Sequence, residues 1–430
     1  MPHLMLKIGN HMDKLLALPI AGDAYLLHSQ GFRILVDGGH SSLSLSTALS
    51  SPDVAARELD IVVCTHADID HAGGLVDLLD KRHIRVGEFW LPGAWGDALP
   101  ALLSQPSLVM DALAQEMENW SPDAEGPSDQ DEEEFETGLH ARIAAERRSL
   151  LQDCHREVAV RDPDSKESKA GVRWLRDFLA DDQRHEAEDT AAAKAFDRGR
   201  RLVRHRASAL HLNEQQRSMW NRTIKTAERI RQIAVQAVRQ DVPVRWFDFG
   251  EFAKTRTAIG GEPGRLVPLN SIELLFPPRP VEAMSYLARL TPVNEECLVF
   301  LAEGERSRPW DVGVIFTGDS PLGFGTGYGD SFLGRNLDEI QTVVATAPHH
   351  GSESNKVAYQ HMNAVARVAI WLRSGGSSRH PGPTFRGLPD VMRVCTSCPH
   401  RGHARRLAVV HLSHPDCWPV LRTNGYECNC

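Results

Sequence analysis

The chain has 430 residues and carries 48 lysines and arginines against 57 aspartates and glutamates, a formal charge of −9. Its length allows one large or two ordinary domains, and its hydrophobic share of 42% and charged share of 24% are those of a folded globular protein. The negative charge excludes a protein that coats nucleic acid through bulk electrostatic attraction, so any polyanion would need a dedicated site.

The composition also bears on the compartment of the protein. No run of about 18 uncharged apolar residues occurs, and the first residues lack the basic segment and apolar core of a secretory signal. The eight cysteines include the isolated Cys64, Cys154 and Cys297, which fit a reducing compartment better than a disulfide framework. We therefore expect a cytoplasmic protein with no membrane association, and we make no prediction of its oligomeric state.

The beginning of the chain alternates short strands with turns. Residues 23–39, "DAYLLHSQGFRILVDGG", predict two strands around Gln30–Gly31, a pattern typical of a hairpin. Residues 47–60 have helical spacing, with Ser51–Pro52 near the start of the expected helix. Three further elements are expected in order: a central strand in 61–66, a helix in 71–82 and a strand in 84–93.

Between about residues 94 and 240 the chain becomes rich in charged, helix-forming residues. We interpret the acidic run at 121–136 as a solvated loop, with an element that binds a partner as the alternative. The basic segment 198–211 could contact a phosphate backbone or form an exposed helix paired with the acidic run. Strand patterns return after residue 241. The simplest arrangement is one α/β core interrupted by a helical insertion, because neither β-rich half alone holds a complete set of metal-binding residues.

Histidines and aspartates are concentrated directly after the predicted central strand, in "THADIDHAGG". His66, Asp68 and Asp70 recur at alternate positions and project to one side of an extended loop, while His71 can reach a neighbouring site. Imidazole nitrogens and carboxylate oxygens together suit divalent metals. Other such side chains also follow apolar strands: Asp319, His349, His350 and His380.

One rim of a sheet would gather these loops, so we expect a pocket that holds two adjacent metal ions. The alternative is a set of scattered surface histidines, with Asp70 serving only to cap the following helix.

The combination of motifs resembles the metallo-β-lactamase superfamily, and within it the hydrolase domain of the bacterial DNA-uptake protein ComEC and its soluble stand-alone relatives. The matching stretches are, in order, "GDAYLLHSQGFRILVDGG", "THADIDHAGG", "TPVNEECLVF", "FTGDS", "APHHGS" and "SGG…RHP". The resemblance implies an α/β fold, a four-layer αββα sandwich. Here it would carry a long helical insertion and a cysteine-containing C-terminal extension.

The resemblance also implies a binuclear metal centre. It carries over as metal ligands His66, Asp68, Asp70, His71, Asp319, with Asp319 as the bridge, and one of His349 and His350, in either order. Asp70 would also orient the attacking water, and His380 would contact the oxyanion or protonate the leaving oxygen unless it is only a surface histidine.

Two positions depart from the usual pattern of the superfamily. Asp68 stands where a histidine is commoner, and the extra carboxylate shifts preference toward manganese, so the two divalent ions are expected to be zinc or manganese. Cys297 stands where relatives usually have serine, and we interpret it as packing on a strand.

The function expected from these features is that of a metal-dependent hydrolase, a phosphodiesterase or nuclease that attacks with a hydroxide activated by two metal ions. Its substrate would be nucleic acid or a nucleotide phosphodiester, with Trp90 and Trp95 either stacking on bases or packing in the core. One alternative is a metallo-hydrolase of acyl compounds such as a lactam or thioester. The other is a noncatalytic regulatory module whose helical insertion binds a protein partner.

The chain is therefore expected to divide into 1–93 and 241–390 as the two halves of the core, 94–240 as the insertion and 391–430 as the extension. Five cysteines of the extension have the pattern of a structural zinc site, with His400 and His403 as substitute ligands: Cys395, Cys398, Cys417, Cys428 and Cys430. The alternative is reduced, partly buried cysteines. The apolar run at 406–412 predicts a strand by which the extension packs on the core.

Overall fold

The structure is a computed structural model. It describes residues 13–80, 84–119, 132–152, 156–162, 169–179, 185–304, 312–336, 342–376, 379–398, 402, 404–412 and 426–427.

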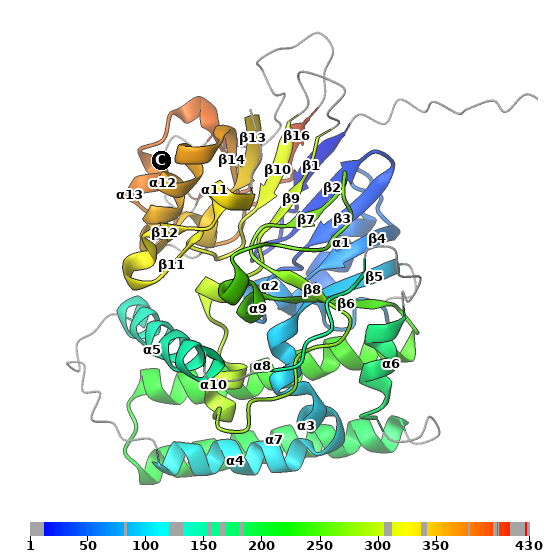
Figure 1. Ribbon diagram of the computed structural model, residues 1–430, viewed down its shortest axis with the longest axis vertical. Coiled ribbons are helices and arrows are strands. Elements are labelled where there is room, and N and C mark those ends of the chain that lie inside the picture. The colour runs from blue at the N-terminus through cyan, green and yellow to red at the C-terminus, as the bar shows by residue number, and fades with distance from the viewer. Residues whose placement is uncertain are drawn as a thin grey trace, which may run out of the picture.

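Two β-sheets stacked face to face form the centre of the molecule (Figure 1). The first sheet contains, in spatial order, β16 (Ala408–His411), β1 (Lys14–Ala17), β2 (Tyr25–Ser29), β3 (Phe32–Val36), β4 (Glu58–Val63), β5 (Arg85–Pro92), β6 (Val244–Asp248) and β8 (Ile272–Leu274). The second contains β17 (Tyr426–Glu427), β15 (Arg393–Cys395), β14 (Arg367–Arg373), β13 (Thr342–Thr346), β10 (Gly313–Phe316), β9 (Phe300–Ala302) and β7 (Val267–Pro268). A separate small hairpin joins β11 (Gly323–Phe324) and β12 (Asp330–Ser331).

Alternation along the strands divides the apolar side chains among three cores. In β4, Ile61 and Val63 point into the core between the two sheets, whereas Val62 points to the outer face. In β10, Phe316 enters the same central core and Ile315 faces outward. Each sheet is thus buried on both faces, and helices cover the outer ones, which confirms the expected α/β sandwich of four layers.

Short helices cover the outer faces. On the first sheet lie α1 (Ser42–Ser50) and α2 (Ile69–Ala72), whereas α10 (Tyr286–Leu290) packs against α4 (Pro106–Asn119) and α8 (Glu214–Arg239) of the insertion. On the second lie α9 (Phe249–Thr255), α11 (Leu333–Asn336), α12 (Lys356–Val365) and α13 (Pro383–Arg386).

The helices between β5 and β6 form a separate mass at one end of the sheets (Figure 1). They are α3 (Leu99–Ser104), α4 (Pro106–Asn119), α5 (Glu132–Gln152), α6 (Ala170–Arg176), α7 (His185–Ala209) and α8 (Glu214–Arg239). Asn213 begins α8 with a capping box completed by Gln216, and Trp220 on α8 is fully buried. Among the described residues, no helix combines the length and apolarity needed to cross a bilayer.

The charged segments of the insertion differ in part from the sequence predictions. The basic segment 198–211 lies mostly on α7, and its arginines pair with α4 and α8: Arg198 with Asp111, Arg200 with Glu228 and Arg206 with Glu118. Of the acidic run, residues 121–131 lie outside the described part of the chain. Its remaining residues begin α5, so the prediction of a loop is wrong for them.

The first half of the core contains the predicted hairpin, β2 and β3 joined at Gln30–Gly31. The helix predicted over 47–60 is wrong: α1 begins after Ser41, whose hydroxyl accepts a hydrogen bond from the Ser44 amide, and ends at Ser50. The chain cannot continue as helix because Pro52 lacks an amide hydrogen, and residues from Glu58 onward form β4 instead. Strand β1 was not predicted because its apolar run is short and does not alternate.

Two glycine pairs, Gly38–Gly39 and Gly73–Gly74, lie against each other beside the loop between β4 and α2. The Gly74 amide donates to the Gly39 carbonyl at 2.6 Å, and the Gly38 amide donates to the His71 carbonyl at 2.6 Å. A Cβ atom on Gly74 would lie 1.8 Å from the Gly38 oxygen. The helix predicted over 71–82 is therefore wrong: α2 ends at Ala72 and a single 3-10 turn follows, because the backbones must approach this closely.

A Gly74→Ala change is expected to destabilise the fold by roughly 2–4 kcal/mol, since the new methyl group must displace backbone rather than a flexible side chain. Urea unfolding would measure the loss. Gly329→Ala is the matched control, because Gly329 has open space around it and an ordinary negative φ. Equal midpoints for the two variants would contradict the close-contact explanation.

The C-terminal extension joins both sheets. Strand β16 pairs with β1 at the edge of the first sheet, and β15 pairs with β14 in the second. Cys395 and Cys398 are buried, and the Arg373 guanidinium donates to the Cys395 sulfur. The other members of the expected zinc site lie outside the described residues: Cys417, Cys428, Cys430, His400 and His403. Cys154 lies outside them too.

Asp248 at the end of β6 provides a test of stability against pH. Its carboxylate accepts the Glu251 amide at 2.7 Å, and burial raises its pKa to about 6 although Arg156 opposes the rise. A raised folded pKa means that ionisation costs stability as the pH rises above the unfolded value of about 3.9. Asp248→Asn, which keeps the acceptor, should gain roughly 2–3 kcal/mol at pH 7.5 and nothing at pH 4, in denaturant titrations. The exposed Asp53→Asn is the control, and an equal gain at both pH values would contradict the assignment.

Candidate metal centre

Four loops deliver the predicted site residues to one place, and each loop follows a buried strand. His66, Asp68, Asp70 and His71 follow β4, and Asp319 follows β10. His349 and His350 follow β13, and His380 lies in the segment after β14. The buried strands hold the loop ends rigidly, so these side chains are positioned by the cores of the two sheets.

The first group of potential metal ligands lies on one side of Asp319. His66, Asp68 and Asp319 offer donor atoms that all lie within 4.8 Å of one another. His66 Nε2 is 3.5 Å from Asp68 Oδ2 and 3.6 Å from Asp319 Oδ2. His349 Nε2 lies 3.7 Å from the same Asp319 oxygen. We call this arrangement site 1.

The second group lies on the other side of Asp319. Asp23, His71, Asp319 and His350 also bring donor atoms within 4.8 Å of one another. His71 Nε2 lies 3.0 Å from Asp319 Oδ1, the oxygen that site 1 does not use. Asp70 is outside this group and instead contacts His350 Nε2 through Oδ2 at 2.8 Å. We call this arrangement site 2, and Asp319 separates it from site 1.

All four histidines of the two sites are held through Nδ1, which leaves Nε2 to face the centre. Asp37 Oδ2 holds His71 at 2.8 Å and Asp23 Oδ1 holds His350 at 3.0 Å. Thr65 Oγ1 lies 3.1 Å from His66 Nδ1, and Asn294 Nδ2 lies 3.5 Å from His349 Nδ1. Partners of this kind fix the orientation of metal-binding imidazoles in proteins.

Several central atoms make no well-aligned hydrogen bond among the described residues, although His71 Nε2 and Asp319 Oδ1 lie 3.0 Å apart. They are buried and comprise His66 Nε2, His71 Nε2, Asp319 Oδ1 and Asp23 Oδ2. Such atoms cost free energy unless another group satisfies them. Neutral imidazole nitrogens and carboxylate oxygens at these distances fit a divalent metal, so the residues present fit the kind of ion that the sequence implies.

The electrostatics of the site agree with that fit. Burial disfavours a charged imidazole at His71, yet Asp319 and Asp37 outweigh it and raise its pKa well above the usual value. Burial likewise opposes ionisation of Asp319, but His71 and His349 hold the pKa of this carboxyl well below its usual range. The centre therefore favours ionised carboxylates, and a divalent ion would replace the protons on the imidazoles.

His380 lies above the two histidines that follow β13. Its ring centroid is 5.7 Å from that of His349 and 6.0 Å from that of His350. Burial, followed by the charges of His350 and His349, lowers the pKa of His380 to about 3. Its ring is therefore neutral at physiological pH and can donate one N–H to a substrate oxygen.

Two observations differ from the sequence predictions, and a third decides between two alternatives. Asp23 and Asp37 were missed, although "GDA" and "VDGG" are part of the matching stretches, because each is a lone aspartate beside a hairpin. Trp90 and Trp95 are buried, so of the two expected alternatives they pack in the core rather than stack on bases. Cys297 does more than pack: its sulfur accepts the Asp319 amide at 3.2 Å and lies 3.4 Å from His66 Nδ1.

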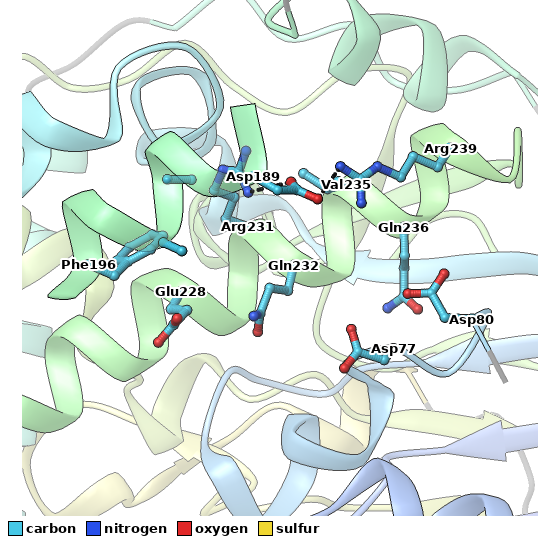
Figure 2. Close-up of a pocket in the computed structure, with 12 residues that line it drawn as sticks. Asp77, Asp80, Asp189, Phe196, Glu228, Arg231, Gln232, Val235, Gln236 and Arg239 are labelled. Carbon is cyan, nitrogen blue, oxygen red and sulfur yellow. Dashed lines mark hydrogen bonds and ion pairs between the residues drawn. The ribbon is translucent and has the colours of Figure 1, made fainter. Parts of the chain in front are cut away.

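Helix α8 of the insertion supports the metal-binding loop from behind. Arg229 is buried and donates from Nε to the carbonyl of Ala67, between His66 and Asp68, at 2.8 Å. Gln236 donates to the Leu75 carbonyl at 2.6 Å and accepts the Leu79 amide at 3.0 Å. Figure 2 shows Gln236 pointing from α8 toward the turn that carries Asp77 and Asp80. The insertion is thus joined to the loop that carries half of the site.

The sequence comparisons agree with this geometry. The profile of the metallo-beta-lactamase superfamily matches residues 18–144, a span that holds β2 to β5, the loop after β4 and part of the insertion. The match supports the superfamily for this part of the chain, and the superfamily consists mostly of metal-dependent hydrolases. Comparison with curated proteins gives no significant match.

Arg229 provides a test of the support from α8. Arg229→Gln and Arg229→Met both remove the charge, but only methionine leaves the Ala67 carbonyl without its donor. We expect the metal dissociation constant of the methionine variant to be roughly 10-fold higher than that of the glutamine variant, by competition with a chelator. Arg239→Met, farther along α8 and paired with Asp189, is the control. Equal affinities for the two Arg229 variants would show that the hydrogen bond does not position the loop.

Proposed function

We propose that the chain is a metal-dependent phosphodiesterase or nuclease that binds two divalent ions. The observation that carries the proposal is the position of Asp319, whose two carboxylate oxygens face separate groups of donors. Asp319 would bridge the ions, with His66, Asp68 and His349 at one and His71, His350 and Asp23 or Asp70 at the other.

Bound divalent ions would neutralise charge on a phosphoryl oxygen and make water in the site more acidic. The side chains around them have separate roles. Asp70 is 27% exposed, so its carboxylate can accept a hydrogen bond from water on the open side of the centre and orient that water. The neutral His380 would donate its N–H to an oxygen of the scissile group or of the leaving group. Asp23, Asp37 and Thr65 would keep the imidazoles in place during the reaction.

A phosphodiester of nucleic acid or of a nucleotide is the proposed substrate. Two adjacent cations suit a transition state whose charge is spread over phosphoryl oxygens. The motifs that resemble the ComEC-type hydrolase domain support the same class. Site 1 has two carboxylates for one histidine among its closest donors, and this oxygen-rich set supports manganese over zinc.

The proposal is tested by turnover of bis-p-nitrophenyl phosphate and of labelled single-stranded DNA, with zinc and with manganese. Asp319→Ala should lower kcat/KM by about 1,000-fold or more and reduce the bound metal, measured by mass spectrometry, because both sites lose a ligand. Asp330→Ala is the control, since Asp330 is exposed.

Other results would point elsewhere. Turnover of nitrocefin or a thioester, without phosphodiester turnover, would favour an acyl hydrolase. A protein that binds no metal and turns over none of these substrates would be a regulatory module, and the proposal would fail.

A further inference from the structure

The open side of the metal centre faces the helical insertion. Most ligands are nearly inaccessible, with exposed fractions of 5% for the His66 side chain and 4% for Asp319. The more exposed members are Asp68 at 35% and His349 at 26% at site 1, and Asp70 at 27% beside site 2. The open side of the centre therefore runs along these three side chains, and site 1 contributes two of them.

Helix α5 of the insertion is fixed beside this opening. Arg147 on α5 donates from Nε to the Ala288 carbonyl at 2.8 Å and from Nη1 to Glu296 at 2.5 Å, while Arg148 pairs with Glu295. The segment that receives these bonds also carries Asn294, which contacts His349. Figure 1 shows α5 between the second sheet and the base of the insertion formed by α4 and α7. The insertion is thus anchored to the same segment that borders site 1.

The same face of α5 also carries a histidine, His140. His140 precedes Arg147 by seven residues, which is about two helical turns, so the two side chains share a face. His140 is half-buried, and the charged groups that act on it are those of site 1: Asp68, His349, His66 and Asp319. His140 is in turn one of the groups that lower the pKa of Asp68.

His140 stands outside the ligand groups themselves. Among the described residues, neither group of donors gathered within 4.8 Å includes it. An imidazole on the anchored face of α5, close enough to interact electrostatically with site 1 without joining its ligands, is placed to contact what binds there. The Cys297, Thr65 and Asn294 contacts already hold the ligands, so His140 is not needed to orient them.

We propose that His140 is a substrate-contacting residue, which the insertion places at site 1 to hydrogen-bond a phosphoryl oxygen of the bound substrate. This inference rests on the proposed phosphodiesterase function and adds to it that the insertion forms part of the substrate site. The insertion would thereby limit which phosphodiesters can enter.

The test compares His140→Ala and His140→Gln with the manganese-loaded wild type. The alanine variant should lose about 10- to 100-fold in kcat/KM for bis-p-nitrophenyl phosphate, as expected for a lost hydrogen bond to a charged group. It should weaken the binding of inorganic phosphate, measured calorimetrically, by a similar factor. Glutamine retains a donor and should recover part of both. Metal content should stay at the wild-type value in each variant.

His205→Ala is the matched control, because His205 is exposed on α7 of the same insertion. Wild-type kcat/KM and wild-type phosphate binding in His140→Ala would overturn the inference, and so would the loss of a metal ion, which would make His140 a ligand. If the alanine variant does not fold, the kcat/KM and phosphate binding of the glutamine variant are compared with those of the wild type instead. If the wild type itself has no phosphodiester turnover, the proposed function fails. The calorimetric comparison of phosphate binding then still tests whether His140 contacts the bound anion.

Discussion

The arrangement of the centre depends on one buried carboxylate. Asp319 presents its two oxygens to histidines from different loops, His66 and His349 on one side and His71 on the other. A carboxylate with so little exposure is stable only when cations or protonated imidazoles surround it. The strands β4, β10 and β13 must therefore end close together, and this requirement links the loops of the two sheets.

The parts of the fold that look peripheral serve the same requirement. The adjoining glycine backbones bring the turn after β3 against the loop after β4, which places Asp37 beside His71. The insertion contributes from two directions, since α8 holds the metal-binding loop from behind and α5 stands at the open side. The helical insertion is thus attached to the metal centre on two sides, through α8 and through α5.

The sequence predicted the layers of the fold well, and the structure confirms them, because alternating or continuous apolar runs determine which strands are buried. The predicted ligands remain predictions until metal binding is measured, although the structure brings His66, Asp68, His71 and Asp319 together. Asp23 escaped prediction because its partner His350 is 327 residues away. His140 escaped because a histidine within a charged helical segment has no local signal of its target.

Errors in the local predictions have a common physical origin. Helical spacing in 47–60 and 71–82 describes apolar side chains correctly but ignores what the backbone can do. Pro52 and the close contact of Gly74 with Gly38 stop the helices that the spacing indicates. The first helix ends through the local effect of Pro52, and the second ends through the tertiary contact of the glycine backbones.

The pairing of β1 with β16 determines when the first sheet can be completed. Leu15 of β1 lies opposite Val410, so one side of the β1 backbone finds its partner almost 400 residues later in the chain. While the chain leaves the ribosome, that side stays an unpaired sheet edge, the kind of edge that attracts other extended chains. Contacts this distant in sequence form slowly, which makes the closing of this edge a late event in folding and a point at which shortened chains would aggregate.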